Sequence, residues 1–337
     1  MSKKTYSQAI NEALRQEMRR DPNVIVMGED VAGGHGASGD TGSVGGVFGL
    51  TRGLYKEFGP DRVLDTPISE SAIIGAASGA AVTGMRPVAE IMFVDFVGVC
   101  FDQIYNQAAK FRYMFGGKAK TPIVIRTAIG AGLRAGAQHS QTLHPLFTMV
   151  PGLKVAMPAS PYDAKGLLIN AIRDDDPVIF MESKLLYGME GEVPDEAYRI
   201  PFGEANIVRE GKDLTFVAFG AMVPRALAVA GVLAADGISV EVVDPRTTSP
   251  LDEDTILESV GKTGRLVIID ESPPRCSLAA DVSSMVADKG FGSLKAPIGK
   301  VTCPHTPVPF APNLEDEFMP NPRRIEAAAR AALAYAR

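Results

Sequence analysis

The sequence predicts two α/β domains, each with a doubly wound arrangement in which helices cover both faces of a parallel sheet. Three observations support this prediction. Short, nearly continuous apolar runs alternate with helical stretches, which is typical of parallel strands buried on both faces. The alternation stops once, between residues 188 and 204, and then restarts. The chain has 337 residues, 46% of them hydrophobic, which is enough material for two packed cores.

The first predicted domain covers residues 1–187. It opens with a helix over 5–20, in which apolar side chains recur at helical spacing before Asp21-Pro22 ends it. A Gly-rich loop over 28–49 follows the first strand. The predicted strands are 24–27, 62–64, 87–93, 122–127, 153–157 and 178–182, and the predicted helices are 52–58, 69–83, 95–115 and 160–174.

Residues 188–204 lose the periodicity and accumulate Gly, Pro and acidic residues, so they are predicted to be a linker. The second predicted domain covers 205–337. Its predicted strands are 214–219, 239–243 and 266–269, and its predicted helices are 224–235, 252–260, 277–288 and 323–334.

Composition excludes several classes of protein. The net charge of −6, with no clustered Lys and Arg, argues against nucleic-acid binding. No uncharged stretch has the length and composition of a membrane span or a secretory signal. The three cysteines are odd in number and far apart, which fits reduced thiols. We therefore expect a soluble, cytoplasmic protein.

One string resembles a dinucleotide-binding motif. Gly130-Ala-Gly132-Leu-Arg-Ala135 follows a predicted strand, but Pro145 cuts short the helix that should come next. No Asp or Glu lies about 20 residues beyond it to bind a ribose hydroxyl. We interpret these glycines as a loop that passes close to another group, and a stand-alone NAD oxidoreductase remains an alternative.

Two segments combine a polar residue with apolar surroundings. Glu70 lies in the first turn of a helix whose other residues are small or apolar. From composition alone, it could simply be a carboxylate favoured by the helix dipole. His139 is one of only four histidines and lies in a polar loop after a buried strand, where it could be an ordinary hydrogen-bonded residue.

These segments resemble the β subunits of 2-oxo acid dehydrogenase complexes. The matching strings follow the family's order over nearly the whole chain: Thr66-Pro-Ile-Ser-Glu70, Phe101-Asp-Gln-Ile, Gln138-His-Ser-Gln141, Pro151-Gly-Leu-Lys154 and Arg246-Thr-Thr-Ser-Pro250. The long Gly-rich loop and Pro304-His-Thr-Pro-Val-Pro309 are more similar to acetoin dehydrogenase β subunits. The resemblance implies a transketolase-like pyrimidine-binding domain followed by a transketolase C-terminal domain.

The resemblance also implies roles for individual residues. Glu70 aligns with the carboxylate that binds the pyrimidine ring of thiamine diphosphate. Sharing a proton with that ring favours its imino tautomer, which then removes the thiazolium proton. Phe96 aligns with the aromatic residue that packs on this ring, although it could also be a core phenylalanine. His139 aligns with the histidine that handles protons as the acyl group passes to lipoamide.

A structural monovalent cation such as K⁺ is implied by a set of four positions, although the acidic ones could equally form a solvated turn: Ile123, Ala171, Asp174 and Asp176. The family's Gly-Asp-Gly motif and the Asn-containing loop that hold Mg²⁺ and the diphosphate do not occur in this sequence. The resemblance therefore implies that a separate α subunit binds them, in an α₂β₂ heterotetramer.

Acetoin is the first expected substrate, with cleavage followed by transfer of the acetyl-level fragment to a lipoyl domain. The alternative is oxidative decarboxylation of pyruvate or a branched-chain 2-oxo acid. A lipoyl acyltransferase subunit is the second expected partner. A noncatalytic assembly subunit is another possibility, in which the acidic segment Glu315-Asp-Glu317 would be a docking patch for a basic subunit-binding domain, a role compatible with catalysis.

Overall fold

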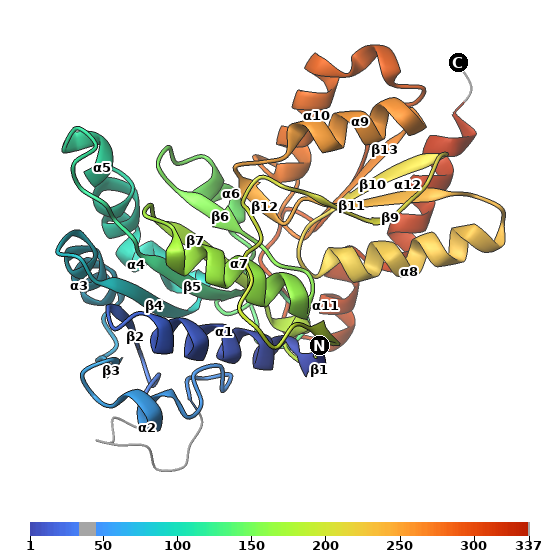
Figure 1. Cartoon of the computed structure of the whole chain (residues 1–337). Helices are drawn as coiled ribbons and strands as arrows, with labels where there is room; N and C mark the ends of the chain where they lie inside the picture. The colour runs from blue at the N-terminus through green and yellow to red at the C-terminus, as the bar shows by residue number, and fades with distance from the viewer. Residues whose placement is uncertain (34–44, 336–337) are drawn as a thin grey trace. The chain divides into compact units, whose positions relative to one another are not determined.

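The computed structural model describes residues 1–33 and 45–335, which form two compact units (Figure 1). Unit 1 comprises Met1–Ile129, Leu146–Glu182 and Leu186–Phe202. Unit 2 comprises Gly130–Pro145, Ser183–Leu185 and Gly203–Arg337. The part of the predicted Gly-rich loop between residues 34 and 44 lies outside the described residues.

Six strands of unit 1 pair in the order β6-β7-β5-β4-β2-β3. The pairings of β2 with β3, β2 with β4, β4 with β5 and β6 with β7 are parallel. Strands β2, β5 and β7 are buried along their whole length, and most of their residues are apolar. The strands are β2 (Val24–Gly28), β3 (Val63–Asp65), β4 (Arg86–Phe93), β5 (Val124–Ile129), β6 (Lys154–Ala156) and β7 (Val178–Ser183).

Local sequence signals explain where the main helices of unit 1 begin. Thr5 and Gln8 form a capping box at the start of α1, and Ser160 caps α7 with Pro161 following. The helices α1 and α7 pack side by side (Figure 1). The helices are α1 (Tyr6–Arg20), α2 (Leu54–Phe58), α3 (Glu70–Val82), α4 (Val97–Asp102), α5 (Phe111–Met114) and α7 (Pro161–Arg173), and α6 (His144–Thr148) begins in unit 2.

The segment 188–204, predicted as a linker, contains strand β8 (Glu190–Val193). This strand pairs in antiparallel fashion with β1 (Ser2–Thr5), so the chain's first residues form a two-stranded sheet with it. Such pairing between distant segments has no local sequence signal.

Unit 2 contains a five-stranded sheet with the order β14-β13-β10-β11-β9, parallel except at its β9 edge. Helices α8 and α12 lie on one side of this sheet, and α9 and α10 on the other (Figure 1). The strands are β9 (Asn206–Arg209), β10 (Leu214–Ala218), β11 (Val240–Asp244), β12 (Thr247–Ser249), β13 (Leu266–Asp270) and β14 (Gly299–Thr302). The helices are α8 (Met222–Ala235), α9 (Glu253–Thr263), α10 (Leu278–Lys289), α11 (Pro312–Phe318) and α12 (Pro322–Ala334).

The single long helix predicted over 95–115 is wrong. The segment is divided into a 3₁₀ turn at Val94–Phe96, α4, a π-helix at Gln103–Ala108, and α5. Tertiary contacts hold this broken path, since Gln103 packs against Gly75 and the Lys110 ammonium donates to the Pro151 carbonyl at 2.6 Å. Over residues 1–33 and 45–335, no helix has the length and apolar character needed to cross a membrane.

Candidate functional site

The carboxyl ends of neighbouring parallel strands in unit 1 carry acidic side chains. Glu29 follows β2, Asp65 ends β3, and Glu70 begins α3. Phe96 follows β4, which pairs with the other side of β2. Ligands of α/β sheets bind at this edge because loops and helix N-termini meet there. We refer to Glu29, Asp30, Asp65 and Glu70 as the acidic edge.

Glu70 is half-buried at the first position of α3, where the helix dipole favours a negative charge. Ser71 fastens the start of this helix, because its hydroxyl donates to the Val99 carbonyl at 2.6 Å. In the part of the chain that the structure describes, Glu70 forms no ion pair. The helix therefore presents a carboxylate whose charge no neighbouring side chain balances.

The pKa values of two groups near Glu70, Glu29 and Cys100, show that negative charges lie close together at this edge. Burial raises the pKa of Glu29, and the charges of Asp30 and Glu70 raise it further. Burial also raises the pKa of the Cys100 thiol to about 12, again with a contribution from Glu70. Glu29 and Asp65 were not predicted as site residues, although each follows or ends a predicted strand, which is a signal that could have found them.

Asp65 is bound on one side only. Its Oδ1 accepts a hydrogen bond from the Ala32 amide at 2.6 Å, whereas its Oδ2 is buried with no partner among the described residues. Burial raises the pKa of Asp65, and the Asp30 charge adds to this rise. A buried carboxylate oxygen without a donor costs free energy unless a ligand or another subunit supplies one.

Phe96 is half-buried in the 3₁₀ turn after β4. Its ring meets Phe93 edge-to-face, with centroids 5.8 Å apart and an interplanar angle of 81°. Phe93 in turn packs edge-to-face on Phe48 at 5.6 Å. An aromatic row thus reaches the edge at which Glu70 lies, and Cys100, whose thiol feels the Glu70 charge, is only four residues beyond Phe96.

His139 belongs to unit 2, in the loop between β5 and α6. Its amide donates to the Gly136 carbonyl at 3.4 Å, and its own carbonyl accepts a bond from the Lys184 ammonium. The half-buried imidazole is therefore carried on a backbone held from two sides. The structure brings Glu70 and Phe96 to one edge of unit 1, and it places His139 in unit 2.

The four positions of the predicted monovalent cation site all lie in unit 1: Ile123, Ala171, Asp174 and Asp176. The carbonyls of the first three each accept one bond, from Val178, Asp174 and Arg86 respectively. The Lys154 ammonium lies 2.7 Å from both carboxylate oxygens of Asp174 and 3.3 Å from Asp176 Oδ2. These two carboxylates are thus already paired with a cationic side chain.

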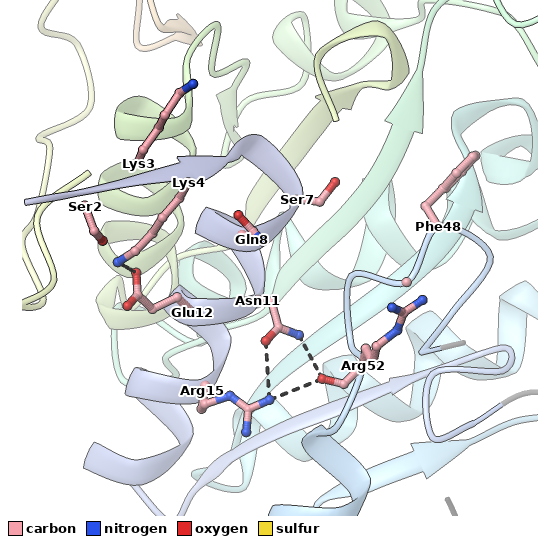
Figure 2. Close-up of a pocket in the computed structure, with 11 residues that line it drawn as sticks. Ser2, Lys3, Lys4, Ser7, Gln8, Asn11, Glu12, Arg15, Phe48 and Arg52 are labelled. Carbon is pink, nitrogen blue, oxygen red and sulfur yellow. Dashed lines mark hydrogen bonds and ion pairs between the residues drawn. The ribbon is translucent and has the colours of Figure 1, made fainter. Parts of the chain in front are cut away.

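A separate groove of about 690 Å³ lies in unit 1 along β1 and α1 (Figure 2). Asn11 and Arg15 donate to the Arg52 carbonyl at 3.1 and 3.2 Å, which fastens the segment after the Gly-rich loop to α1. Two other charges in the groove, Lys4 and Glu12, pair with each other. None of the predicted site residues lines it.

The glycine string at 130–135 forms a loop in unit 2, and the next helix, α6, begins only at His144. A Cβ atom at Gly130 would come within 2.9 Å of Glu271 Oε1, which confirms the interpretation as a close approach. Of the docking patch predicted over 315–317, Asp316 and Glu317 are exposed, but Glu315 is not. Glu315 is fully buried, because it accepts bonds from the Gly132 amide and the Arg134 guanidinium of this same loop.

Comparison with known proteins agrees with this architecture. Residues 2–190 match the model of the transketolase pyrimidine-binding domain, and residues 203–325 match that of the transketolase C-terminal domain. The chain is 66% identical over 322 residues to the β subunit of acetoin:2,6-dichlorophenolindophenol oxidoreductase from Cupriavidus necator, covering 96% of this chain and 95% of the relative. The chain belongs to this β-subunit family.

Other members of the family carry different names. The Bacillus subtilis acetoin:2,6-dichlorophenolindophenol oxidoreductase β subunit is 59% identical over 95% of this chain and 94% of its own. The 2-oxoisovalerate dehydrogenase β subunit of Bacillus subtilis is 45% identical over 98% of both chains. The predictions of family and of an enzyme subunit are confirmed.

A solved structure described as a split-gene transketolase, an inactive β4 tetramer, superposes with a TM-score of 0.77. It is 25% identical in sequence, and the match covers 98% of this chain and 99% of the other. The predicted fold class, two doubly wound transketolase-like domains, is confirmed.

Proposed function

We propose that this chain is the β subunit of a thiamine-diphosphate-dependent acetoin dehydrogenase component and that it supplies the pyrimidine side of the cofactor site. The names of the two relatives at 66% and 59% identity support acetoin as the substrate. The alternative is pyruvate or a branched-chain 2-oxo acid, which the names of relatives at 45% identity support.

The acidic edge is the observation that carries this proposal. Glu70 has no cationic partner, and the buried Asp65 Oδ2 has no donor within the described chain. An aminopyrimidine ring carries hydrogen-bond donors and gains positive character when it is protonated, so it complements such an edge. Phe96 offers this ring an aromatic surface for packing. The residues present therefore fit the cofactor.

In this proposal each residue has a separate task. Bound thiamine diphosphate supplies a thiazolium carbon that can be deprotonated to attack a carbonyl group. Glu70 holds the shared proton at the pyrimidine nitrogen, and Phe96 fixes the plane of the ring. The surrounding small residues of α3 leave Glu70 the only ionisable group on that helix.

His139 is proposed to move protons during acyl transfer to the lipoyl group. The Lys184 bond to its carbonyl and the Gly136 bond to its amide hold the backbone of the loop, and an imidazole can accept and donate protons near neutral pH. We expect His139→Ala to spare cofactor binding and to lower the rate of lipoamide acylation by about 10²–10⁴-fold, the usual contribution of a general acid or base. Rapid-quench measurement of acyl transfer checks this, and an unchanged transfer rate would remove the role.

The proposed partner is an α subunit in an α₂β₂ assembly. Exposed apolar side chains gather on α4, on α5 and in the turn just before α3, and these helices lie together at one end of unit 1 (Figure 1). Examples are Ile68, Val99 and Tyr113, which are 76%, 65% and 89% exposed. Gly79 on α3 has no atom within 4 Å of a built Cβ, so a second chain could approach closely there. Such a surface fits a stable subunit interface.

Mg²⁺ and the diphosphate are assigned to that α subunit. Among the described residues no group of three or more His, Cys, Asp or Glu side chains is arranged to hold a metal ion. We also propose a lipoyl acyltransferase as the further partner and a structural K⁺ at residues 123, 171, 174 and 176. Thermal unfolding in K⁺ and in choline chloride tests the K⁺ site, since equal stability in both salts would count against it.

One experiment tests the whole proposal. The chain is co-expressed with an α subunit of the same family, and the complex is assayed with acetoin, pyruvate and a branched-chain 2-oxo acid, using 2,6-dichlorophenolindophenol as electron acceptor. We expect thiamine-diphosphate-dependent reduction of the dye with acetoin and none from either chain alone. Activity confined to a 2-oxo acid would favour the alternative, and activity of this chain alone would contradict the shared site.

A further inference from the structure

Residues 130–141 of unit 2 form a loop whose two ends are joined, and His139 lies near its second end. The Gly130 amide donates to the Gln141 carbonyl at 3.0 Å, which closes the loop. Inside it, the bond from the His139 amide to the Gly136 carbonyl forms a turn. We call residues 130–141 the His139 loop. Because this loop is short and closed, a displacement of one part of its backbone also moves His139.

Glu315 on α11 binds the first half of the His139 loop. Its Oε1 accepts a bond from the Gly132 amide at 2.9 Å, and its Oε2 accepts bonds from the Arg134 amide at 3.2 Å and from the Arg134 guanidinium at 2.6 Å. Both oxygens of a fully buried carboxylate are thus used by one loop. Hydrogen bonds to an ionised acceptor are roughly twice as strong as bonds between neutral groups. Glu315 therefore fixes two backbone positions of the loop at once.

Arg134 has a backbone conformation that requires such support. Its φ angle is +59°, in the left-handed region that residues other than glycine rarely occupy. A residue keeps this conformation only when its surroundings hold it there, and such positions concentrate at functional sites. Glu315 supplies the support, because it binds both the amide and the guanidinium of Arg134. Arg134 lies two residues before Gly136, so this support acts just before the turn that carries His139.

The segment that carries Glu315 also packs on the His139 loop through apolar contacts. Phe318, at the end of α11, shares a buried apolar cluster with Ala131 of the loop. Phe310 lies just before α11, and a Cβ atom at Gly136 would be 3.4 Å from its Cδ2. The loop is thus contacted by this segment on both sides of the Glu315 bonds. These contacts fix α11 against the loop, so the carboxylate is held ready to bind it.

We propose that Glu315 is a positioning residue for His139, which holds the loop so that the imidazole lies where it can move protons during acyl transfer. The inference rests on the proposed function and deepens it, because it names the group that keeps the proton-handling residue in place. Asp316 offers a comparison within the same helix. Its carboxylate also binds the Arg134 guanidinium, at 2.7 Å, but it is exposed, and among the described residues it binds no backbone group of the loop.

Hydrogen exchange of the full chain, followed by mass spectrometry, tests the hold on the loop. Glu315→Gln keeps the shape of the side chain but leaves one oxygen to accept bonds, so Gly132 or Arg134 loses its partner. We expect the amides of the His139 loop to exchange about tenfold faster, which corresponds to the loss of one bond to a charged group. Asp316→Asn is the matched control and should leave this exchange unchanged. Unchanged exchange in Glu315→Gln would overturn the inference.

The assembled enzyme tests the consequence for the reaction. Glu315→Gln should slow acyl transfer to the lipoyl domain by about tenfold to a hundredfold, the effect of displacing a reacting group by about 1 Å. Exchange of the thiazolium proton and KM should stay the same, and Asp316→Asn should change none of these quantities. In the His139→Ala background, Glu315→Gln should cause no further loss, since a positioning residue acts only through the residue that it places.

Arg134→Gln replaces Glu315→Gln if the latter does not assemble with its partner. The Arg134 side chain is 35% exposed, and its loss leaves both amide bonds to Glu315 in place. The same pattern is expected at a smaller size, with acyl transfer slowed by about threefold, the loss of one side-chain bond. An unchanged transfer rate in this variant would overturn the inference in the same way.

The remaining outcomes separate this inference from the proposed function. Losses that multiply in the double variant, or acyl transfer and proton exchange that fall together in Glu315→Gln, would overturn the positioning role. Normal transfer in Glu315→Gln with slow transfer in His139→Ala would overturn it too, while the proposed function stands. Normal transfer in His139→Ala would remove the proposed role of His139 and with it the role of Glu315 in the reaction, although faster exchange in Glu315→Gln would still support its hold on the loop.

Discussion

Unit 1 contains two sets of carboxylates, one that forms ion pairs with a cationic side chain and one that does not. Glu90 and Glu182 lie inside the sheet and flank the buried Arg126. That guanidinium donates to Glu90 at 2.8 Å and to the two oxygens of Glu182 at 2.7 and 3.0 Å. The carboxylates of the acidic edge, by contrast, form no ion pair within the described residues.

This contrast separates structural charge from charge that is available for binding. Three buried ionisable groups that satisfy one another stabilise the sheet only as a set, since the loss of one leaves the others unpaired. At the acidic edge the repulsion among Glu29, Asp30 and Glu70 persists in the free chain. We infer that the second set is kept because something outside this chain completes it.

The largest expected effect comes from removing the charge of Glu70. Glu70→Gln should lower cofactor-dependent turnover of the assembled enzyme by about 10²–10⁴-fold, because the amide cannot hold the shared proton. Exchange of the thiazolium proton for deuterium, followed by NMR, should slow in parallel. The melting temperature of the free chain should change little, because Glu70 forms no ion pair whose loss would cost stability. Unchanged proton exchange would refute this role for Glu70.

The sequence was informative about elements and much less so about partners. The six parallel strands of unit 1, the three central strands of the unit 2 sheet and the helix that begins at Glu70 follow from apolar runs and from periodicity, which are local signals. The edge strands β9 and β14 of unit 2 were not predicted, because they are short and only partly apolar. Glu90, Arg126 and Glu182 are 36 and 56 positions apart and meet only because β4, β5 and β7 become neighbours in the sheet. No spacing rule predicts such a meeting.

Glu315 is a residue whose sequence pattern predicts exposure although the side chain is buried. Three consecutive acidic residues are typical of a solvated surface, yet Glu315 is buried against the loop that carries Arg134. The sequence separation of the two residues, 181 positions, hides this pairing. The resemblance to known β subunits assigned Glu70 and His139 because it carries information about evolutionary context that residue chemistry alone lacks.

The second prediction concerns the ion pairs of Arg126 with Glu90 and Glu182. Arg126→Met removes the cation and leaves Glu90 and Glu182 buried without it, which should cost about 3–5 kcal/mol in the free energy of unfolding. Urea denaturation of the full chain measures this, and the triple variant with Glu90→Gln and Glu182→Gln is the control that should recover part of the loss. A cost below about 1 kcal/mol would contradict a structural role for the pairing.

The stability of the same variant, Arg126→Met, is expected to fall as pH rises. Burial already raises the pKa of Glu90 and Glu182, and the Arg126 charge opposes this rise. Without Arg126 the folded-state pKa values rise further above the unfolded value of about 4.3, so stability is lost as pH increases through them. The deficit of Arg126→Met relative to the wild type should therefore be larger at pH 8 than at pH 5.

The smallest effect is expected at Glu29, which belongs to the acidic edge. Burial and the neighbouring charges raise the folded-state pKa of this half-exposed carboxyl, so its ionisation destabilises the free chain as pH rises through that value. Glu29→Gln should stabilise the free chain at pH 7 by about 0.2–1 kcal/mol, discounted by solvent screening, and the gain should vanish near pH 4 and shrink in high salt. Thermal unfolding measures this gain, with Glu192→Gln on the solvent side of β8 as a matched control.

In the assembled, cofactor-loaded enzyme the stability gain of Glu29→Gln should disappear, because a bound ring with positive character would then balance the charge of the acidic edge. A gain that persists there would mean that the acidic edge does not face the cofactor.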